Sequence, residues 1–173
     1  MKIITLETIE RGAIFIYPTD TIYGIGCNAL NSKAVIRLRK IKEQYDRPVS
    51  IIAPSKKWIM ENCEVNEGAL SKLPGPYTLI VKLKTKVIAK EVNLGSGTVG
   101  VRMPNHWITR QVAKFGFPIV TTSVNKTGNQ FMTSFDNLDA EIAKKVDFIV
   151  YDGKKEGHPS TIINLINHEI LKR

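Results

Sequence analysis

The sequence predicts an α/β domain built on a mixed β-sheet with flanking helices. Short β-branched runs alternate with amphipathic stretches, which is the pattern of strands interleaved with helices. The prolines and glycines gather in the connections between these runs, and no connection is long enough to separate two domains. A chain of 173 residues, 43% of them hydrophobic, can bury one core without disulfide support. We therefore expect residues 1–173 to form a single domain.

The strands are predicted from their apolar, β-branched composition. The first, AIFIY at 13–17, is apolar throughout and ends at Pro18, as a buried strand would. Further runs of this kind occur at 49–53, 78–83, 98–102, 118–122, 147–151 and 160–165. Their spacing leaves room for a helix in several of the connections.

The helices are predicted from apolar residues at helical spacing. Residues 33–45 form the clearest example, with Ser32 as the expected N-cap and Val35, Leu38, Ile41 and Tyr45 on one side. Other helices are expected at 55–62, 67–73, 106–115 and 137–145. The last is preceded by three candidate caps, Thr133, Ser134 and Asp136.

Composition favours a protein with a polyanionic partner or substrate and argues against membrane, exported and disulfide-rich proteins. The chain has 25 basic and 16 acidic residues, a net charge of +9, which favours a polyanionic partner or substrate. No apolar run approaches the roughly 18 residues of a membrane span, and glutamates interrupt the N-terminal region where an export signal would continue. The two cysteines, Cys27 and Cys63, form no disulfide or zinc framework. We expect a cytoplasmic protein that does not bind membranes.

Several motifs carry little functional information. Gly95, Gly97 and Gly100 spell GxGxxG, but the extended residues that follow favour a turn before a strand over a dinucleotide-binding loop. The three histidines lack the spacing of metal ligands, and no phosphate-binding P-loop motif is present. The basic stretch from Lys33 to Arg47 is either a solvated helix face or a surface for phosphate or RNA.

Two polar loops are the stronger candidates for a binding site. PTDTIYGIG at 18–26 and TTSVNKTG at 121–128 each follow a predicted strand and combine hydroxyl groups with glycine. Hydroxyl and amide groups suit phosphate and ribose oxygens, and glycine allows the backbone to approach a ligand closely. Each loop alone could be a hydrogen-bonded turn, whereas two in one small basic domain favour a ligand site.

Taken in order, six segments resemble the YrdC/TsaC family, the threonylcarbamoyl-AMP synthases. They are PTDTIYGIG, IKEQYDRPVSII, PGPYTLIV, TVGVRMPNH, TTSVNKTG and HPSTIINL, which extend from residue 18 to 165. The resemblance implies a twisted α/β fold with a deep, basic concave cavity. It also implies synthesis of threonylcarbamoyl-AMP and pyrophosphate from L-threonine, bicarbonate or CO2, and ATP with Mg²⁺. A separate threonylcarbamoyl-transferase then modifies tRNA beside the anticodon.

The resemblance also implies roles for individual residues. The expected L-threonine contacts are Thr21, Arg102, Thr121 and Ser160. The expected ATP contacts are Lys42, Arg47, Thr98, Ser123, Asn125 and Arg173. No protein ligand for a metal is implied, so the magnesium ion is expected to come with ATP.

The chain departs from the family pattern at three places. Gln44 stands where many members have an arginine, so Lys40 or Arg47 is the candidate to replace that cation. Phe131-Met132-Thr133 replaces a Ser-Pro-Thr sequence, and the chain ends at Arg173 without the family's longer tail.

Two other functions remain open from the sequence. One is a non-catalytic module that binds tRNA or double-stranded RNA through shape and backbone. The other is a carbamoyl-transfer domain that acts on a different carbamoyl-adenylate.

Overall fold

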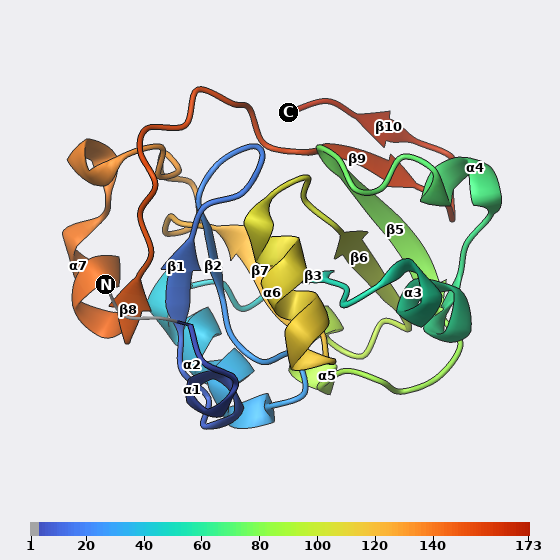
Figure 1. Ribbon diagram of the computed structural model, residues 1–173, viewed down its shortest axis with the longest axis horizontal. Helices are drawn as coiled ribbons and strands as arrows, with labels where there is room; N and C mark the ends of the chain where they lie inside the picture. The colour runs from blue at the N-terminus through green and yellow to red at the C-terminus, as the bar shows by residue number, and fades with distance from the viewer. Residues whose placement is uncertain (1–3) are drawn as a thin grey trace.

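The computed structural model describes residues 4–173 and contains a ten-stranded sheet with helices on both faces (Figure 1). The strand order is β10-β9-β5-β6-β3-β7-β2-β1-β8, with β4 paired to β5. The strands are β1 (Phe15–Tyr17), β2 (Gly24–Gly26), β3 (Ser50–Ile52), β4 (Cys63–Glu64), β5 (Tyr77–Leu83), β6 (Thr98–Arg102), β7 (Ile119–Ser123), β8 (Phe148–Ile149), β9 (Thr161–Asn164) and β10 (Ile170–Leu171). The pairs β1–β8, β3–β6 and β5–β9 are parallel and the other pairs antiparallel, which confirms the predicted mixed sheet.

Eight helical segments flank or connect these strands. They are α1 (Leu6–Glu10), α2 (Ser32–Lys42), α3 (Lys56–Asn62), α4 (Glu67–Leu70), α5 (Lys90–Asn93), α6 (Trp107–Phe115), a 3₁₀ turn η1 (Phe135–Asn137) and α7 (Ala140–Lys145). Figure 1 shows α6 crossing in front of the middle strands. The structure also contains α1, α5, β2, β4 and β10, which were not predicted from the sequence.

The first strand shows how the sheet separates two apolar clusters. Phe15 and Tyr17 pack with side chains of α6, whereas Ile14 and Ile16 pack with side chains of α2. Successive side chains of a strand point to opposite faces, so an apolar run such as AIFIY is buried on both sides. Each of the four side chains is fully buried, which stabilises the fold by about 1.5–3 kcal/mol per side chain.

The helix predicted at 33–45 begins and ends elsewhere. Asn31, not Ser32, caps α2, because its side-chain oxygen accepts the Ala34 N–H at 3.0 Å. The helix ends at Lys42, since Glu43 adopts a left-handed conformation with φ 53°. Tyr45 therefore lies outside the helix and is 62% exposed, so its predicted place on the buried side was wrong.

The helix predicted at 137–145 is in fact two elements. Ser134 caps the 3₁₀ turn, and Asp139 caps α7 by accepting the N–H groups of Glu141 and Ile142. Leu138 is extended between them, so a continuous helix cannot form across it. The predicted caps Thr133 and Asp136 do not start α7.

Both cysteines are buried and unpaired, as the sequence indicated. Burial raises the pKa of Cys27 to about 12 and that of Cys63 to about 11, because the thiolate is poorly solvated there. They act as small apolar residues of the core. Among residues 4–173, no helix has the length and apolar character needed to cross a membrane.

Candidate functional site

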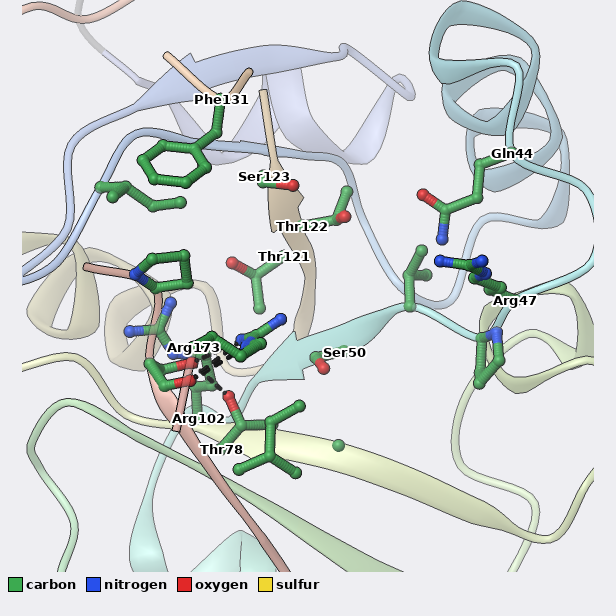
Figure 2. A pocket seen from close by; sticks show the side chains of 18 of the residues that line it. Gln44, Arg47, Ser50, Thr78, Arg102, Thr121, Thr122, Ser123, Phe131 and Arg173 are labelled. Atoms are coloured by element: carbon green, nitrogen blue, oxygen red, sulfur yellow. Dashed lines mark hydrogen bonds between the residues drawn. The ribbon is translucent and has the colours of Figure 1, made fainter. Parts of the chain in front are cut away.

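A cavity of about 550 Å³ opens on the face where the two polar loops meet the sheet (Figure 2). Its walls come from β2, β3, β5, β6, β7 and β9, together with the end of α2. The lining includes nine of the ten residues proposed as contacts, namely Lys42, Arg47, Thr98, Arg102, Thr121, Ser123, Asn125, Ser160 and Arg173. Four of these are cations, and neither Asp nor Glu occurs among the described lining residues. The expected basic cavity is therefore present.

Arg102, the last residue of β6, is a buried cation at one end of the cavity. Its Nη2 donates to Asp20 Oδ1 and to Thr21 Oγ1, both at 3.2 Å. Thr21 is the one expected contact that is not among the described lining residues, and it is joined to the cavity by this hydrogen bond to Arg102. Burial lowers the pKa of Arg102, and Asp20 opposes that shift. Its Nε has no hydrogen-bond partner among the described residues, although the side chain is only 9% exposed. A buried N–H without an acceptor favours an anionic ligand.

The PTDT loop is folded so that it meets this arginine. Thr19 Oγ1 donates to the carbonyl of Ile22 at 2.7 Å and accepts the N–H of Thr21 at 3.1 Å. Asp20 also accepts the N–H of Asn105 at 2.8 Å, which joins the loop to the segment after β6. Asp20 was not predicted from the sequence as the partner of Arg102. Its place between two threonines at the end of a strand was the available signal.

Ser160, just before β9, lies near the same end of the cavity. Its hydroxyl is 2.7 Å from Thr78 Oγ1 and accepts from Arg173 Nη2 at 3.1 Å. Arg173 also donates to the Ser160 carbonyl from Nε and Nη2, and Figure 2 shows its side chain close to Arg102. The charge of Arg173 further lowers the pKa of Arg102. An anion between the two guanidiniums would relieve their repulsion.

Lys42, the last residue of α2, is 2% exposed and holds the second polar loop. Its Nζ donates to the carbonyl of Ser123 and to the carbonyl of Asn125, the latter at 3.0 Å. The Asn125 side chain in turn donates to the carbonyl of Asn129 at 2.8 Å, which closes the loop. Burial lowers the pKa of Lys42 to about 8, because the ammonium is largely desolvated.

Arg39 fixes the loop that carries Gln44 and Arg47 to the cavity. It is 5% exposed and donates from Nη1 to the carbonyls of Gln44 and Arg47 at 3.0 and 2.9 Å. Nε and Nη2 donate to the carbonyls of Glu91 and Val92 in α5. In Figure 2 the Gln44 and Arg47 side chains lie at the opposite side of the cavity from Arg102. In the sequence Arg39 is one of several cations in the basic stretch from Lys33 to Arg47, and this structural role was not predicted.

Gly95, Gly97 and Gly100 form a turn and the strand that follows it, as predicted. Gly95 and Gly97 have φ of 73° and 75°, and β6 begins at Thr98. At Gly100 a Cβ would lie 2.4 Å from Ser50 Oγ, so glycine lets β3 and β6 pair closely beside the cavity.

The cations of α2 divide between the inside and the outside of the fold. Arg39 and Lys42 are buried, whereas Lys33, Arg37 and Lys40 are exposed. Arg37 makes a two-point ion pair with Asp147, at 2.7 and 3.1 Å. This contact joins α2 to the segment before β8.

Comparisons with known proteins agree with this geometry. The sequence profile of the Sua5/YciO/YrdC family, described as telomere recombination, matches residues 7–173. A Methanocaldococcus jannaschii protein named "Putative threonylcarbamoyl-AMP synthase" is 38% identical over 95% of this chain and 80% of its own length. The threonylcarbamoyl-AMP synthase of Pyrococcus abyssi is 34% identical over 91% of this chain. This chain spans about half of that relative, 48% of its length.

A solved structure gives the same result for the fold. The crystal structure of Pyrococcus abyssi Sua5 complexed with L-threonine superposes with a TM-score of 0.82 and 31% identity, over 95% of this chain and 51% of that one. The profile match covers nearly the whole chain, and the fold and sequence likeness extend over the same residues. The chain therefore belongs to the Sua5/YciO/YrdC family, as a homologue of threonylcarbamoyl-AMP synthases.

Proposed function

We propose that the protein is an L-threonylcarbamoyladenylate synthase. It would form threonylcarbamoyl-AMP and pyrophosphate from L-threonine, bicarbonate or CO2, and ATP. The observation that carries this proposal is Arg102, a buried guanidinium with a free Nε at the end of a cavity lined by cations. The names of the two relatives support the same reaction. We also propose that residues 1–173 act as a single YrdC-like domain.

The threonine end of the cavity is assigned to the residues around Arg102. The free Nε and a neighbouring nitrogen suit the two oxygens of an α-carboxylate, which an arginine binds with parallel hydrogen bonds. Thr21, Thr121 and Ser160 are all at least 95% buried and offer hydroxyl groups to the amine and side chain of threonine.

The ATP site is assigned to the rest of the lining. Lys42 and Arg47 would neutralise the phosphates, and Ser123, Asn125 and Thr98 would contact phosphate or ribose oxygens. Arg173 lies beside Ser160 and Arg102 at the threonine end and would contact ATP from there.

In the proposed reaction, the threonine amine adds CO2 and loses a proton to give a carbamate. A carbamate oxygen then attacks the α-phosphorus of ATP, the bond to the β-phosphate oxygen breaks, and pyrophosphate leaves. The participants are mainly anionic, so the residues named here act by positioning and by charge neutralisation.

Magnesium fits this site as an ion that ATP brings. Mg²⁺ is commonly bound by one or two carboxylates, water and substrate phosphates. The described lining offers hydroxyl and amide oxygens but no Asp or Glu side chain. No cluster of three or more His, Cys, Asp or Glu suitable for a metal occurs among residues 4–173. The ion would thus be held through the phosphates and water.

The product would pass to a separate threonylcarbamoyl-transferase that modifies tRNA. The rival proposal is a module that binds tRNA or double-stranded RNA without catalysis. In such a module the exposed cations of α2 would contact the phosphates of the RNA. It does not explain why a buried arginine and three other cations line one cavity. The cavity therefore favours the enzyme.

One experiment tests the proposal. Purified protein is incubated with ATP, magnesium, bicarbonate and single amino acids, and pyrophosphate release is measured. We expect release to require L-threonine and bicarbonate together. Equal release with L-serine, or release that does not depend on bicarbonate, would refute the assigned reaction. A carbamoyl-transfer domain would instead consume ATP with a different carbamoyl donor.

A further inference from the structure

Residues 151–160, which we call the strap, connect β8 to β9 without regular secondary structure. In Figure 1 this orange-red segment passes across the top of the molecule. Its last two residues, Pro159 and Ser160, line the cavity. The position of Ser160 at the threonine end therefore depends on how the strap is held.

Asp152 is the main polar anchor of the strap. Its Oδ2 lies 3.1 Å from His106 Nε2, and its Oδ1 lies 2.7 Å from Lys155 Nζ and 3.3 Å from the Tyr23 hydroxyl. Its own N–H donates to that hydroxyl at 3.1 Å. Lys155 belongs to the strap, whereas Tyr23 and His106 come from two other parts of the chain. Asp152 thus joins the strap to both.

Tyr23 connects this anchor to the cavity. Its hydroxyl donates to the Gly153 carbonyl at 2.6 Å, and its ring stacks on Tyr151 with centroids 5.5 Å apart. The Tyr151 ring also stacks on Phe135, with ring centroids 4.1 Å apart. Tyr23 also lines the cavity, and it immediately precedes β2. The residue that holds the strap therefore contacts the ligand space as well.

His106 connects the anchor to the segment that follows Arg102. Its Nδ1 is buried and has no hydrogen-bond partner among the described residues, which disfavours a proton there. Burial also lowers the pKa of His106. The neutral ring then carries its proton on Nε2 and donates it to Asp152. Asn105, next to His106, donates to Asp20, the partner of Arg102.

The far part of the strap lies against the PTDT loop. A Cβ at Gly157 would be 2.4 Å from the Thr21 carbonyl oxygen, so only glycine allows this approach. Three residues later, Ser160 reaches Thr78 and Arg173. The strap therefore packs on Thr21 at Gly157, and three residues later it places Ser160 at the cavity.

We propose that Asp152 is a positioning residue for the amino-acid substrate. It fixes the strap to Tyr23 and to the segment after Arg102, so that Ser160 and Thr21 stand at fixed distances from the Arg102 guanidinium. Asp152 lies outside the cavity lining and acts through these residues. The inference rests on the proposed function, because the substrate is taken to be L-threonine.

The test compares Asp152→Asn with Glu156→Gln, which removes a charge from an exposed residue of the same strap. We expect Asp152→Asn to raise the KM for threonine by up to about 5-fold, the effect typical of weakening partly exposed ion pairs, with little change in the KM for ATP. Glu156→Gln should keep both constants. An unchanged threonine KM, or equal rises in both constants, would overturn the proposal.

A second pair of variants tests the path through His106. His106→Gln can keep an N–H donor near the position of Nε2, so it should retain near-normal threonine KM, whereas His106→Leu should behave like Asp152→Asn. Equal effects of the two variants would refute this path.

Amide hydrogen exchange at 153–160 should quicken in Asp152→Asn and not in Glu156→Gln. Threonine titration of the wild-type protein separates the two hypotheses. If the wild-type binds no threonine, the proposed function fails as well; if it binds and Asp152→Asn binds equally well, only this inference fails.

Discussion

Arg102 offers the sharpest test of how the cavity recognises an amino acid. Its Nε is free, while Nη2 is already shared between Asp20 and Thr21. In Arg102→Ala the substrate carboxylate would lose at least one hydrogen bond to a charged donor, which typically costs about 1.5–3 kcal/mol. This corresponds to a rise in the KM for threonine of about 10- to 150-fold. The KM for ATP should change far less.

The same change also affects the fold. The Asp20 carboxylate is 11% exposed and would keep the Asn105 N–H but lose its ion-pair partner. Breaking a buried ion pair by removing one partner costs about 3–5 kcal/mol. The double variant Asp20→Asn/Arg102→Ala removes the uncompensated charge and should recover part of the stability without recovering threonine use. Arg102→Lys should restore only part of the threonine affinity, since an ammonium cannot form the planar two-point contact.

The assay measures pyrophosphate release with threonine and ATP varied in turn, together with thermal unfolding of each variant. A normal threonine KM in a folded Arg102→Ala protein would remove this arginine from the amino-acid site. A rise in the KM for ATP of equal size would place Arg102 in the nucleotide site instead.

Three further predictions concern the nucleotide side of the cavity. The pKa of Lys42 is about 8 in the folded protein and 10.5 when unperturbed. Between these pH values Lys42 is protonated in the unfolded chain but largely neutral in the folded protein, so the free energy of unfolding should increase as the pH rises from about 8 to 10.5. Affinity for a non-hydrolysable ATP analogue should nevertheless fall above about pH 8, where the cation is lost, and Lys42→Arg should abolish that inflection; a flat profile in the wild-type would contradict the phosphate contact. Asn125→Ala should weaken binding of the same analogue in calorimetric titration but not binding of threonine, and wild-type affinity would make the loop a structural turn. Arg39→Leu should lower the free energy of unfolding by about 3 kcal/mol or more, and the melting temperature by roughly 10 °C, because it leaves buried carbonyls without donors. The control is Lys40→Leu, at an exposed neighbouring residue, and equal effects of the two variants on stability would refute the role of Arg39.

The sequence predicted the strands that carry apolar, β-branched runs but missed β2. Glycine is depleted in strands, so GIG at 24–26 reads as a loop. In the structure a Cβ at Gly26 would lie 2.1 Å from the Val120 carbonyl and 3.0 Å from the Tyr17 ring. The strand thus needs glycine because of contacts with residues distant in sequence, which periodicity cannot reveal.

The site was predictable where a motif places its own residues at the cavity, as for Arg102 and Ser160. Supporting residues were missed when their partners come from elsewhere. Asp20 pairs with a residue 82 positions away, and Arg39 reaches carbonyls 52 and 53 positions away. A basic residue on a helix gives no sign of such distant acceptors. Whether the lining residues contact threonine and ATP as assigned stays a prediction.

The described lining of the cavity contains four cations and no Asp or Glu, and this charge also affects product release. Pyrophosphate carries more negative charge than threonine, so the groups that draw ATP in would prolong the residence time of the leaving product. In the proposed reaction we therefore expect the first turnover to be faster than later ones, as a burst of product in rapid-quench measurements. Added inorganic pyrophosphate should inhibit in competition with ATP. Neutralising Arg47 at the mouth should shorten the residence time, even as it weakens the capture of ATP.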